Sequence, residues 1–148
     1  MKEVYMQLAL NLALIAMKKD EVPVGCVIVK DDKIISKAYN TRNKTQNAIN
    51  HAEIIAIKKA CKKLKSWRLD NAEIYVTLEP CPMCAGAIAN ARIKKCIFGA
   101  YDKTSSSNLT KNIFEDKRLN HKVICEGGVC QDECSKLLTS FFQNKRKS

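Results

Sequence analysis

Two short stretches decide what this chain folds into: His51-Ala52-Glu53 and, further along, Pro80-Cys81-Pro82-Met83-Cys84. One imidazole and two thiolates make three ligands of the kinds that zinc prefers. A structural zinc site is usually closed by four protein ligands, whereas a catalytic site keeps one position open for water. Three ligands with a carboxylate two residues from the histidine therefore predict chemistry at a metal ion.

The cysteines stand at the start of a predicted helix. Cys81 and Cys84 are three residues apart, so their side chains share one face, and Pro82 suits the first helical turn. Unpaired backbone N–H groups and the positive end of the helix dipole favour the thiolates that bind metal. His51 opens another predicted helix. We therefore expect two helix N-termini to converge on one ion, with water in the fourth position.

Glu53 is too close to His51 along the chain to be a convenient fourth ligand, and it is well placed to move protons. It would take a proton from the attacking water and pass it to a departing amine. His-x-Glu followed by Pro-Cys-x-x-Cys is the known signature of the zinc-dependent nucleobase deaminases, so this mechanism is matched to a described class. Iron or cobalt could occupy the same ligands.

Each of these elements also has a plainer interpretation. Asn50-x-x-Glu53 has the spacing of a capping box, in which the glutamate only supports a helix start. The cysteine pair alone is also typical of a redox couple or of half a structural zinc site. A fourth structural ligand would then come from the C-terminal part of the chain: His121, Cys125, Cys130 or Cys134. The order of the three elements, each at a helix start, favours the open site.

The composition limits the classes of protein to which the chain can belong. Of 148 residues, 46% are hydrophobic and 28% charged, which predicts one globular domain over residues 1–148. The formal net charge of +11 indicates an anionic partner, nucleic acid first and a membrane surface second. Eight cysteines in a chain of this length favour reduced thiols in the cytosol over a disulfide framework. The apolar stretch from Met6 to Met17 is short for a membrane span, so we predict a buried first helix.

The hydrophobic pattern predicts alternating helices and strands. Helices are expected over residues 2–19, from His51, from Pro82 and after Gly127-Gly128, and strands over residues 24–30, 33–40, 73–79, 94–100 and 122–125. The polar segments 40–50 and 101–120 are predicted loops. Strand, helix and strand with short links imply a parallel pair with a right-handed crossover. The sum is an α/β fold in which helices cover both faces of a mixed sheet.

Helical spacing also predicts which faces are buried. The second helix is expected to bury Ile54, Ile57, Cys61 and Leu64, and the last helix to bury Cys134, Leu137, Leu138 and Phe141. The lysines between Lys58 and Lys65 fill the rest of the second helix. They are typical of a solvated helix surface, and a general attraction to RNA is the second interpretation.

Taken together, these residues resemble the bacterial tRNA-specific adenosine deaminases, which have a three-layer α/β/α cytidine deaminase-like fold with a mixed five-stranded sheet. The resemblance covers almost the full chain. Besides the metal motifs, the similar segments are Glu21–Gly25, Tyr75–Ala87, Ala91–Ile93, Phe98–Ala100, Asn120-His121, Asp132–Cys134, and Leu137-Leu138 with Phe141-Phe142 and the basic tail. The metal motifs indicate only a zinc deaminase, whereas the C-terminal segments point to the tRNA enzymes.

The resemblance implies hydrolysis of the wobble adenosine in a tRNA anticodon stem-loop to inosine, by a cytoplasmic homodimer with one zinc ion per subunit. No DNA or membrane partner is expected. It implies His51, Cys81 and Cys84 as the zinc ligands, and Glu53 as the proton shuttle.

The resemblance also implies a set of substrate-binding residues. Asn40 would contact the purine, Asp102 would lie near the ribose, and the C-terminal helix would pack on the anticodon loop through Phe142, Lys145 and Arg146. An amide offers a donor and an acceptor to a base edge, and an aromatic ring stacks on an unpaired base while cations meet phosphates. Without the resemblance, the same residues are typical of a strand-ending turn, a loop acid, and a core phenylalanine with a solvated tail.

Two segments depart from the family pattern, and both bear on the rim of the substrate site. Ala48-Ile49-Asn50 stands where the family usually has Pro-Thr-Ala, and Thr104–Asn108 stands where it has glycines. A rival hypothesis is a deaminase of free bases or nucleotides, such as guanine or cytosine. A second is an RNA-binding module with a structural zinc ion. The net charge of +11 and the basic tail favour a polymeric substrate.

Overall fold

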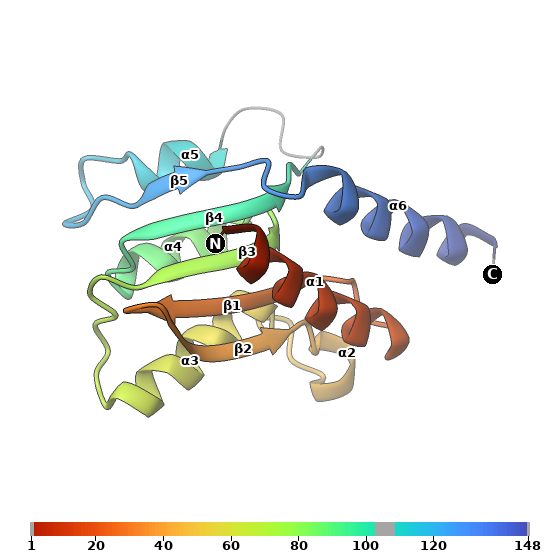
Figure 1. Ribbon diagram of the computed structural model, residues 1–148, viewed down its shortest axis with the longest axis horizontal. Helices are drawn as coiled ribbons and strands as arrows, with labels where there is room; N and C mark the ends of the chain where they lie inside the picture. The colour runs from red at the N-terminus through yellow and green to blue at the C-terminus, as the bar shows by residue number, and fades with distance from the viewer. Residues whose placement is uncertain (1, 103–108, 148) are drawn as a thin grey trace.

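The computed structural model describes residues 2–102 and 109–147, with side chains described through Lys145 (Figure 1). The elements in chain order are α1 (Lys2–Lys18), β1 (Gly25–Lys30), β2 (Lys33–Tyr39), α2 (Arg42–Thr45), α3 (Ala52–Leu64), β3 (Glu73–Leu78), α4 (Pro82–Asn90), β4 (Lys95–Ala100), α5 (Leu109–Phe114), β5 (Ile124–Glu126) and α6 (Gln131–Lys147). In these described ranges, α1 and the other helices all fall short of the length and apolarity needed to cross a membrane.

The five strands form one sheet in the order β2-β1-β3-β4-β5. β1 pairs antiparallel with both β2 and β3, whereas β4 runs parallel to β3 and to β5. The hairpin between β1 and β2 turns at Asp31 and Asp32, whose φ angles of 52° and 60° match the twist of the flanking strands. The expected hairpin and the parallel β3-α4-β4 unit are both confirmed.

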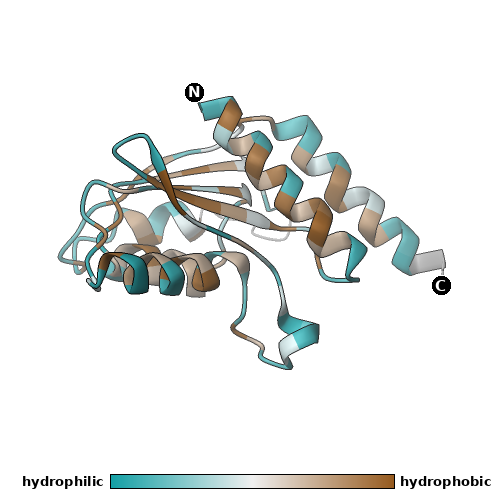
Figure 2. Ribbon diagram, turned by 60° about the horizontal axis from the view of Figure 1, so that its bottom comes forward, coloured by the Kyte–Doolittle hydropathy of each residue, from teal (hydrophilic) through white to brown (hydrophobic). Residues whose placement is uncertain are grey.

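Helices cover both faces of this sheet, as the three-layer prediction requires (Figures 1 and 2). α3 and α4 pack on one face, where alternate strand residues such as Ile28, Ile74 and Cys96 point. α1 and α6 lie side by side on the other face, over Val27, Tyr75 and neighbouring residues. Alternation along each strand therefore divides the core into two clusters, one beneath each helical layer.

Gly25 explains the close packing of α1 on the start of β1. A Cβ atom at this position would collide with the backbone carbonyl of Ala9 and come within 2.7 Å of the backbone nitrogen of Ala13. Because backbone cannot retreat as a flexible side chain can, only glycine fits here. The segment before it, residues 20–24, lies close to the end of α1, where the N–H of Glu21 donates to the carbonyl of Ala16 at 3.0 Å.

Three expectations from the sequence are wrong in detail. The predicted loops contain the short helices α2 and α5, and α5 forms because Phe114 and Thr110 are buried. The fully buried apolar stripe of α3 is Ala52, Ala56 and Ala60, while the predicted row of larger residues is only partly buried. Small side chains let α3 approach the sheet closely, which periodicity alone does not reveal. The departure at Thr104–Asn108 lies outside the described residues.

Candidate active site

The predicted convergence of two helix starts is present in the fold. His51 is the N-cap of α3 and Cys81 the N-cap of α4, and both residues have extended backbone. His51 Nδ1 lies 3.7 Å from Cys81 Sγ and 3.6 Å from Cys84 Sγ. α3 and α4 pack against each other on the same face of the sheet, which brings residues 30 positions apart in the chain into one cluster.

The geometry of this cluster suits a tetrahedral zinc ion. The three ligand atoms all lie within 4.8 Å of one another. Zinc bound to nitrogen and sulfur at tetrahedral angles would place those two atoms about 3.6 Å apart, which agrees with both observed separations. Among the residues that the structure describes, His51, Cys81 and Cys84 are the one group of three or more histidine, cysteine or acidic side chains with this proximity.

The electrostatics of the cluster favour a thiolate. Hydrogen bonds from Cys84 and from His51 lower the pKa of the Cys81 thiol to about 4. The pKa of Cys84 is raised, because it shares its proton with Cys81 and is buried. The hydrogen bond to Cys81 also raises the pKa of His51. Without metal, the two thiols therefore hold one proton between them, and a cation would displace it.

Glu53 lies beside the cluster, at the second position of α3. It is 4% exposed, and burial raises the pKa of its carboxyl group to about 7. The Cys84 thiol is a hydrogen-bond partner of this carboxylate. A carboxyl group with a pKa near neutrality can both accept and return a proton at physiological pH, which is the property required of a general acid–base.

The plainer interpretations of these residues do not match the geometry. The N-cap of α3 is His51, so Asn50 and Glu53 do not form a capping box, and the Asn50 amide donates to Thr45 Oγ1 instead. The ring of His121 lies 2.7 Å from the carbonyl oxygen of Ile93. Cys134 is buried in the cluster beneath α1 and α6, on the opposite face of the sheet. Both therefore lie apart from the candidate metal site.

Comparison with known proteins agrees with this arrangement. The family model of the MafB19-like deaminases matches residues 1–146. A tRNA-specific adenosine deaminase of Bacillus subtilis is 45% identical over 146 residues, which cover 98% of this chain and 91% of that protein. The chain belongs to the tRNA-specific adenosine deaminase family.

Solved structures of deaminases show the same fold. One, from work on A-to-I editing by tRNA:A34 deaminases at the wobble position of transfer RNA, has a TM-score of 0.85 and 37% identity and matches 90% of this chain and 98% of its own. A guanine deaminase from Bacillus subtilis has a TM-score of 0.65 and 36% identity and matches 78% and 76%. The predicted family and the α/β/α fold class are thus confirmed for this deaminase.

Asn40, the predicted purine contact, joins the first turn of α3 to the segment before β1. Its side chain is buried, and its Nδ2 donates to the carbonyl of Val22 at 3.2 Å. Its Oδ1 accepts a 2.7 Å hydrogen bond from the backbone N–H of Ala52, in the first turn of α3. These two bonds use one N–H of Nδ2 and one lone pair of Oδ1, so the amide keeps a second donor and a second acceptor position for a base edge.

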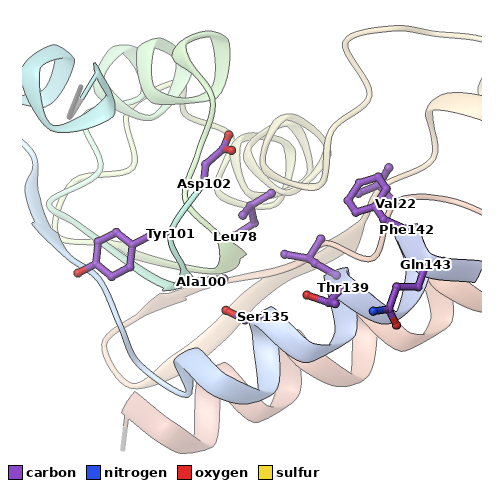
Figure 3. Close-up of a pocket in the computed structure, with 10 residues that line it drawn as sticks. Val22, Leu78, Ala100, Tyr101, Asp102, Ser135, Thr139, Phe142 and Gln143 are labelled. Atoms are coloured by element: carbon purple, nitrogen blue, oxygen red, sulfur yellow. The ribbon is translucent and has the colours of Figure 1, made fainter. Parts of the chain in front are cut away.

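A cavity of about 560 Å³ opens beside Val22 (Figure 3). The C-terminal helix forms one wall and the end of β4 another, and the lining includes both Asp102 and Phe142. Phe142 is 47% exposed and packs edge-on against Phe141 with ring centroids 5.3 Å apart. The structure therefore brings two of the predicted substrate residues, from segments 40 positions apart, to one concave surface.

The predicted basic contacts of the tail are only partly described. Lys145 Nζ forms an ion pair with Asp20 Oδ1 at 2.6 Å and lies 5.7 Å from the centre of the Phe141 ring. This pair ties the end of α6 to the end of α1. The side chain of Arg146 lies outside the described residues.

Three polar residues that hold the segments beside the metal cluster and the cavity, here called the rim, were given no role by sequence reasoning. The buried Glu21 carboxylate accepts hydrogen bonds from the backbone N–H groups of Asn43 and Lys44, at 3.1 and 2.9 Å. Thr110 Oγ1 donates to the carbonyl of Pro80 at 2.6 Å, and Glu79 accepts from the N–H of Asp102 at 2.9 Å. Glu21 lies inside a segment that matches the family, and this match could have marked it as a candidate functional residue. Thr110 lies in none of the segments that match the family, so the sequence offered no such signal for it.

Proposed function

We propose that this protein hydrolyses the wobble adenosine of a tRNA anticodon to inosine, with release of ammonia. The observation that carries the proposal is the His51, Cys81 and Cys84 cluster beside the buried Glu53, in a chain that is 45% identical to a tRNA-specific adenosine deaminase over 98% of its length. The chemistry follows from the residues, and the substrate follows from the family and the charge.

His51 Nδ1 and the sulfur atoms of Cys81 and Cys84 would hold one zinc ion per subunit. When bound, zinc supplies the acidity that makes a water molecule nucleophilic near neutral pH. Glu53 takes the proton that the attacking water loses and delivers it to the exocyclic amine at C6 of adenine, which leaves as ammonia. Because Glu53 is only 4% exposed, this proton transfer is shielded from bulk solvent.

The cavity between β4 and α6 is the proposed site for the nucleotides around the edited base. Phe142 would stack on an unpaired base, Asp102 would face a ribose, and the basic tail with Lys145 and Arg146 would meet phosphates. Asn40 would present its amide to the purine. The net charge of +11 supports a polyanionic substrate over a free base.

The proposal includes a homodimer and a location in the cytosol. All eight cysteines are free thiols, which suits a reducing compartment.

The test is an assay of zinc-loaded protein on a synthetic anticodon stem-loop with adenosine at the wobble position. Guanine, free adenosine and cytidine are assayed in parallel, since a guanine deaminase shares 36% identity with this chain. Inosine formed only in the RNA supports the proposal. Turnover of guanine or of a nucleoside without RNA turnover would keep the zinc chemistry and overturn the RNA substrate.

A matched pair of variants tests the recognition surface. F142A removes the exposed ring that lines the cavity, and we expect the KM for the stem-loop to rise about fivefold or more, as for loss of one stacked base. I15A removes an apolar side chain of α1 that is 40% exposed and lies outside the cavity lining. An equal effect of both substitutions would contradict the assignment of Phe142 to RNA binding.

A further inference from the structure

A second distinctive surface lies at the opposite end of α3 from the metal cluster. Trp67 follows the end of α3 at Leu64 and is 62% exposed. Since α3 has 13 residues, it spans about 20 Å, which separates this indole from His51 by roughly the same distance. Tryptophan is enriched where proteins contact partners, because one side chain offers a large rigid area. This indole is therefore a candidate contact that the metal site does not use.

Two guanidinium groups from different segments lie within cation–π distance of the indole. The Cζ atoms of Arg68 and Arg92 each lie 5.6 Å from the centre of the Trp67 ring. Arg92 comes from the turn after α4, where its backbone has a φ of 64°. Its Nη1 donates to the carbonyls of Ala89 and Asn90 at 3.2 and 3.4 Å, which holds the guanidinium in place. The Arg92 guanidinium is thus positioned near the ring before any ligand arrives.

Backbone hydrogen bonds join the two turns that carry these side chains. The N–H of Leu69 donates to the carbonyl of Ala91 at 2.7 Å, and the N–H of Lys94 donates to the carbonyl of Ala72 at 3.0 Å. A surface whose parts are held this way loses little conformational entropy on binding.

The charge around the indole is strongly positive. Four exposed lysines lie close to Trp67 or Arg92 along the chain: Lys62, Lys63, Lys65 and Lys94. Asp70 offsets part of the charge through its 3.2 Å ion pair with Arg68. Lysines at a helix C-terminus also complement the helix dipole, so charge by itself would not identify a ligand. The feature that selects RNA is an indole that is 62% exposed with two guanidinium groups near its ring, because aromatic rings and arginine planes both stack on bases.

We propose that the Trp67 surface, formed by Trp67, Arg68 and Arg92 with these four lysines, binds an unpaired stretch of RNA. A base stacks on the indole, and the adjoining phosphates lie against the guanidinium and ammonium groups. The inference goes beyond the proposed function, since no step at the metal cluster requires this surface. It adds a second RNA contact on a part of the protein remote from the edited nucleotide.

Trp67 is also the only tryptophan of the chain, so intrinsic fluorescence reports on this surface alone. We would titrate the full-length protein with decauridylate, which contains no adenosine. Saturable quenching that weakens with added salt is expected, because stacking perturbs the indole and counterions are released. Inorganic polyphosphate of similar length provides charge without bases. Equal quenching by polyphosphate, or binding of decauridylate without quenching, would overturn the stacking model.

Variants then test the two guanidinium groups. R68S/R92N removes both cations and keeps a residue at position 92 that tolerates a positive φ. We expect the Kd for decauridylate to rise about fivefold or more and the salt dependence to weaken by about two phosphate contacts. R68S alone leaves the turn after α4 intact and should show a part of this effect. K33S/K37S removes the same charge from β2 and should change the Kd less than about twofold.

Replacement of the indole completes the test. W67A should weaken binding of fluorescein-labelled decauridylate by about fivefold or more in an anisotropy assay, and W67F should retain most of the affinity. If K33S/K37S weakens binding as much as R68S/R92N, the interaction is general charge attraction and the proposal fails. These outcomes are separate from those of the editing assay, because decauridylate cannot be deaminated to inosine.

Discussion

The metal cluster and the substrate rim are held in place by different kinds of contact. His51 and Cys81 are N-caps of two packed helices, so the backbone itself aims their side chains, and Cys84 follows one turn later. The rim is held by single side chains that reach backbone groups far away in the sequence, such as Glu21 to the N–H of Asn43. We therefore expect the metal cluster to tolerate changes in the surrounding sequence, and the proposed RNA recognition to depend on a few isolated hydrogen bonds.

The largest expected effect comes from breaking the cluster at its most buried ligand. C84S replaces a fully buried thiol with a poor zinc ligand, and we expect loss of bound zinc and of measurable inosine formation. Zinc content is measured by mass spectrometry after gel filtration. C61S is the control: it changes a partly buried thiol on α3, outside the metal cluster, and should keep both zinc and activity. A C84S protein with one zinc ion per subunit would contradict the assignment.

Removal of the proton shuttle should be nearly as severe while leaving the rim untouched. E53Q keeps the shape of the buried side chain but cannot carry a proton, so kcat should fall by about 10²–10⁴. The KM for the stem-loop should stay within about threefold, because the proposed RNA contacts lie in the cavity between β4 and α6. Single-turnover kinetics separate the two quantities. Survival of RNA turnover in E53Q would show that another group moves the proton.

The rim is tested by a residue that touches neither metal nor the proposed base position. E21A removes the carboxylate that accepts from Asn43 and Lys44, and hydrogen bonds to a charged group contribute about 1.5–3 kcal/mol. We expect the KM for RNA to rise about tenfold, with kcat within about threefold. E115A deletes an exposed carboxylate on the segment after α5 and should leave both unchanged. A fall in kcat with KM unchanged in E21A would contradict the assignment of Glu21 to RNA binding rather than to the chemical step.

The smallest expected effect concerns stability without metal. Burial raises the pKa of Glu53 from 4.5 to about 7, so ionisation favours the unfolded chain once the pH exceeds the unfolded pKa. The resulting loss of unfolding free energy is absent below about pH 4.5, grows up to about pH 7 and is constant above that pH. Metal-free E53Q should therefore melt a few degrees higher than the parent at pH 8, and at the same temperature at pH 4. Thermal melts in chelator check this, with E115Q expected to show no such difference. A Tm difference between E53Q and the parent that does not depend on pH would contradict the raised pKa.

The sequence by itself determined the candidate ligand set and the class of fold. Cysteines three apart after a proline share a helix face whatever the tertiary structure, and alternation within short apolar runs is a local property of strands. The hairpin at Asp31-Asp32 and the parallel crossover through α4 follow from equally local patterns.

Only the tertiary structure decided which polar residues build the rim and which face of α3 is buried. Glu21, Glu79 and Thr110 act on partners 22 to 30 residues away, and nothing in their neighbourhoods marks those partners. The helices α2 and α5 are too short to be stable alone, so their formation depends on such distant contacts. The alanine stripe of α3 is buried because the sheet lies close to it, and that distance is set by packing of the whole domain rather than by the periodicity of one helix.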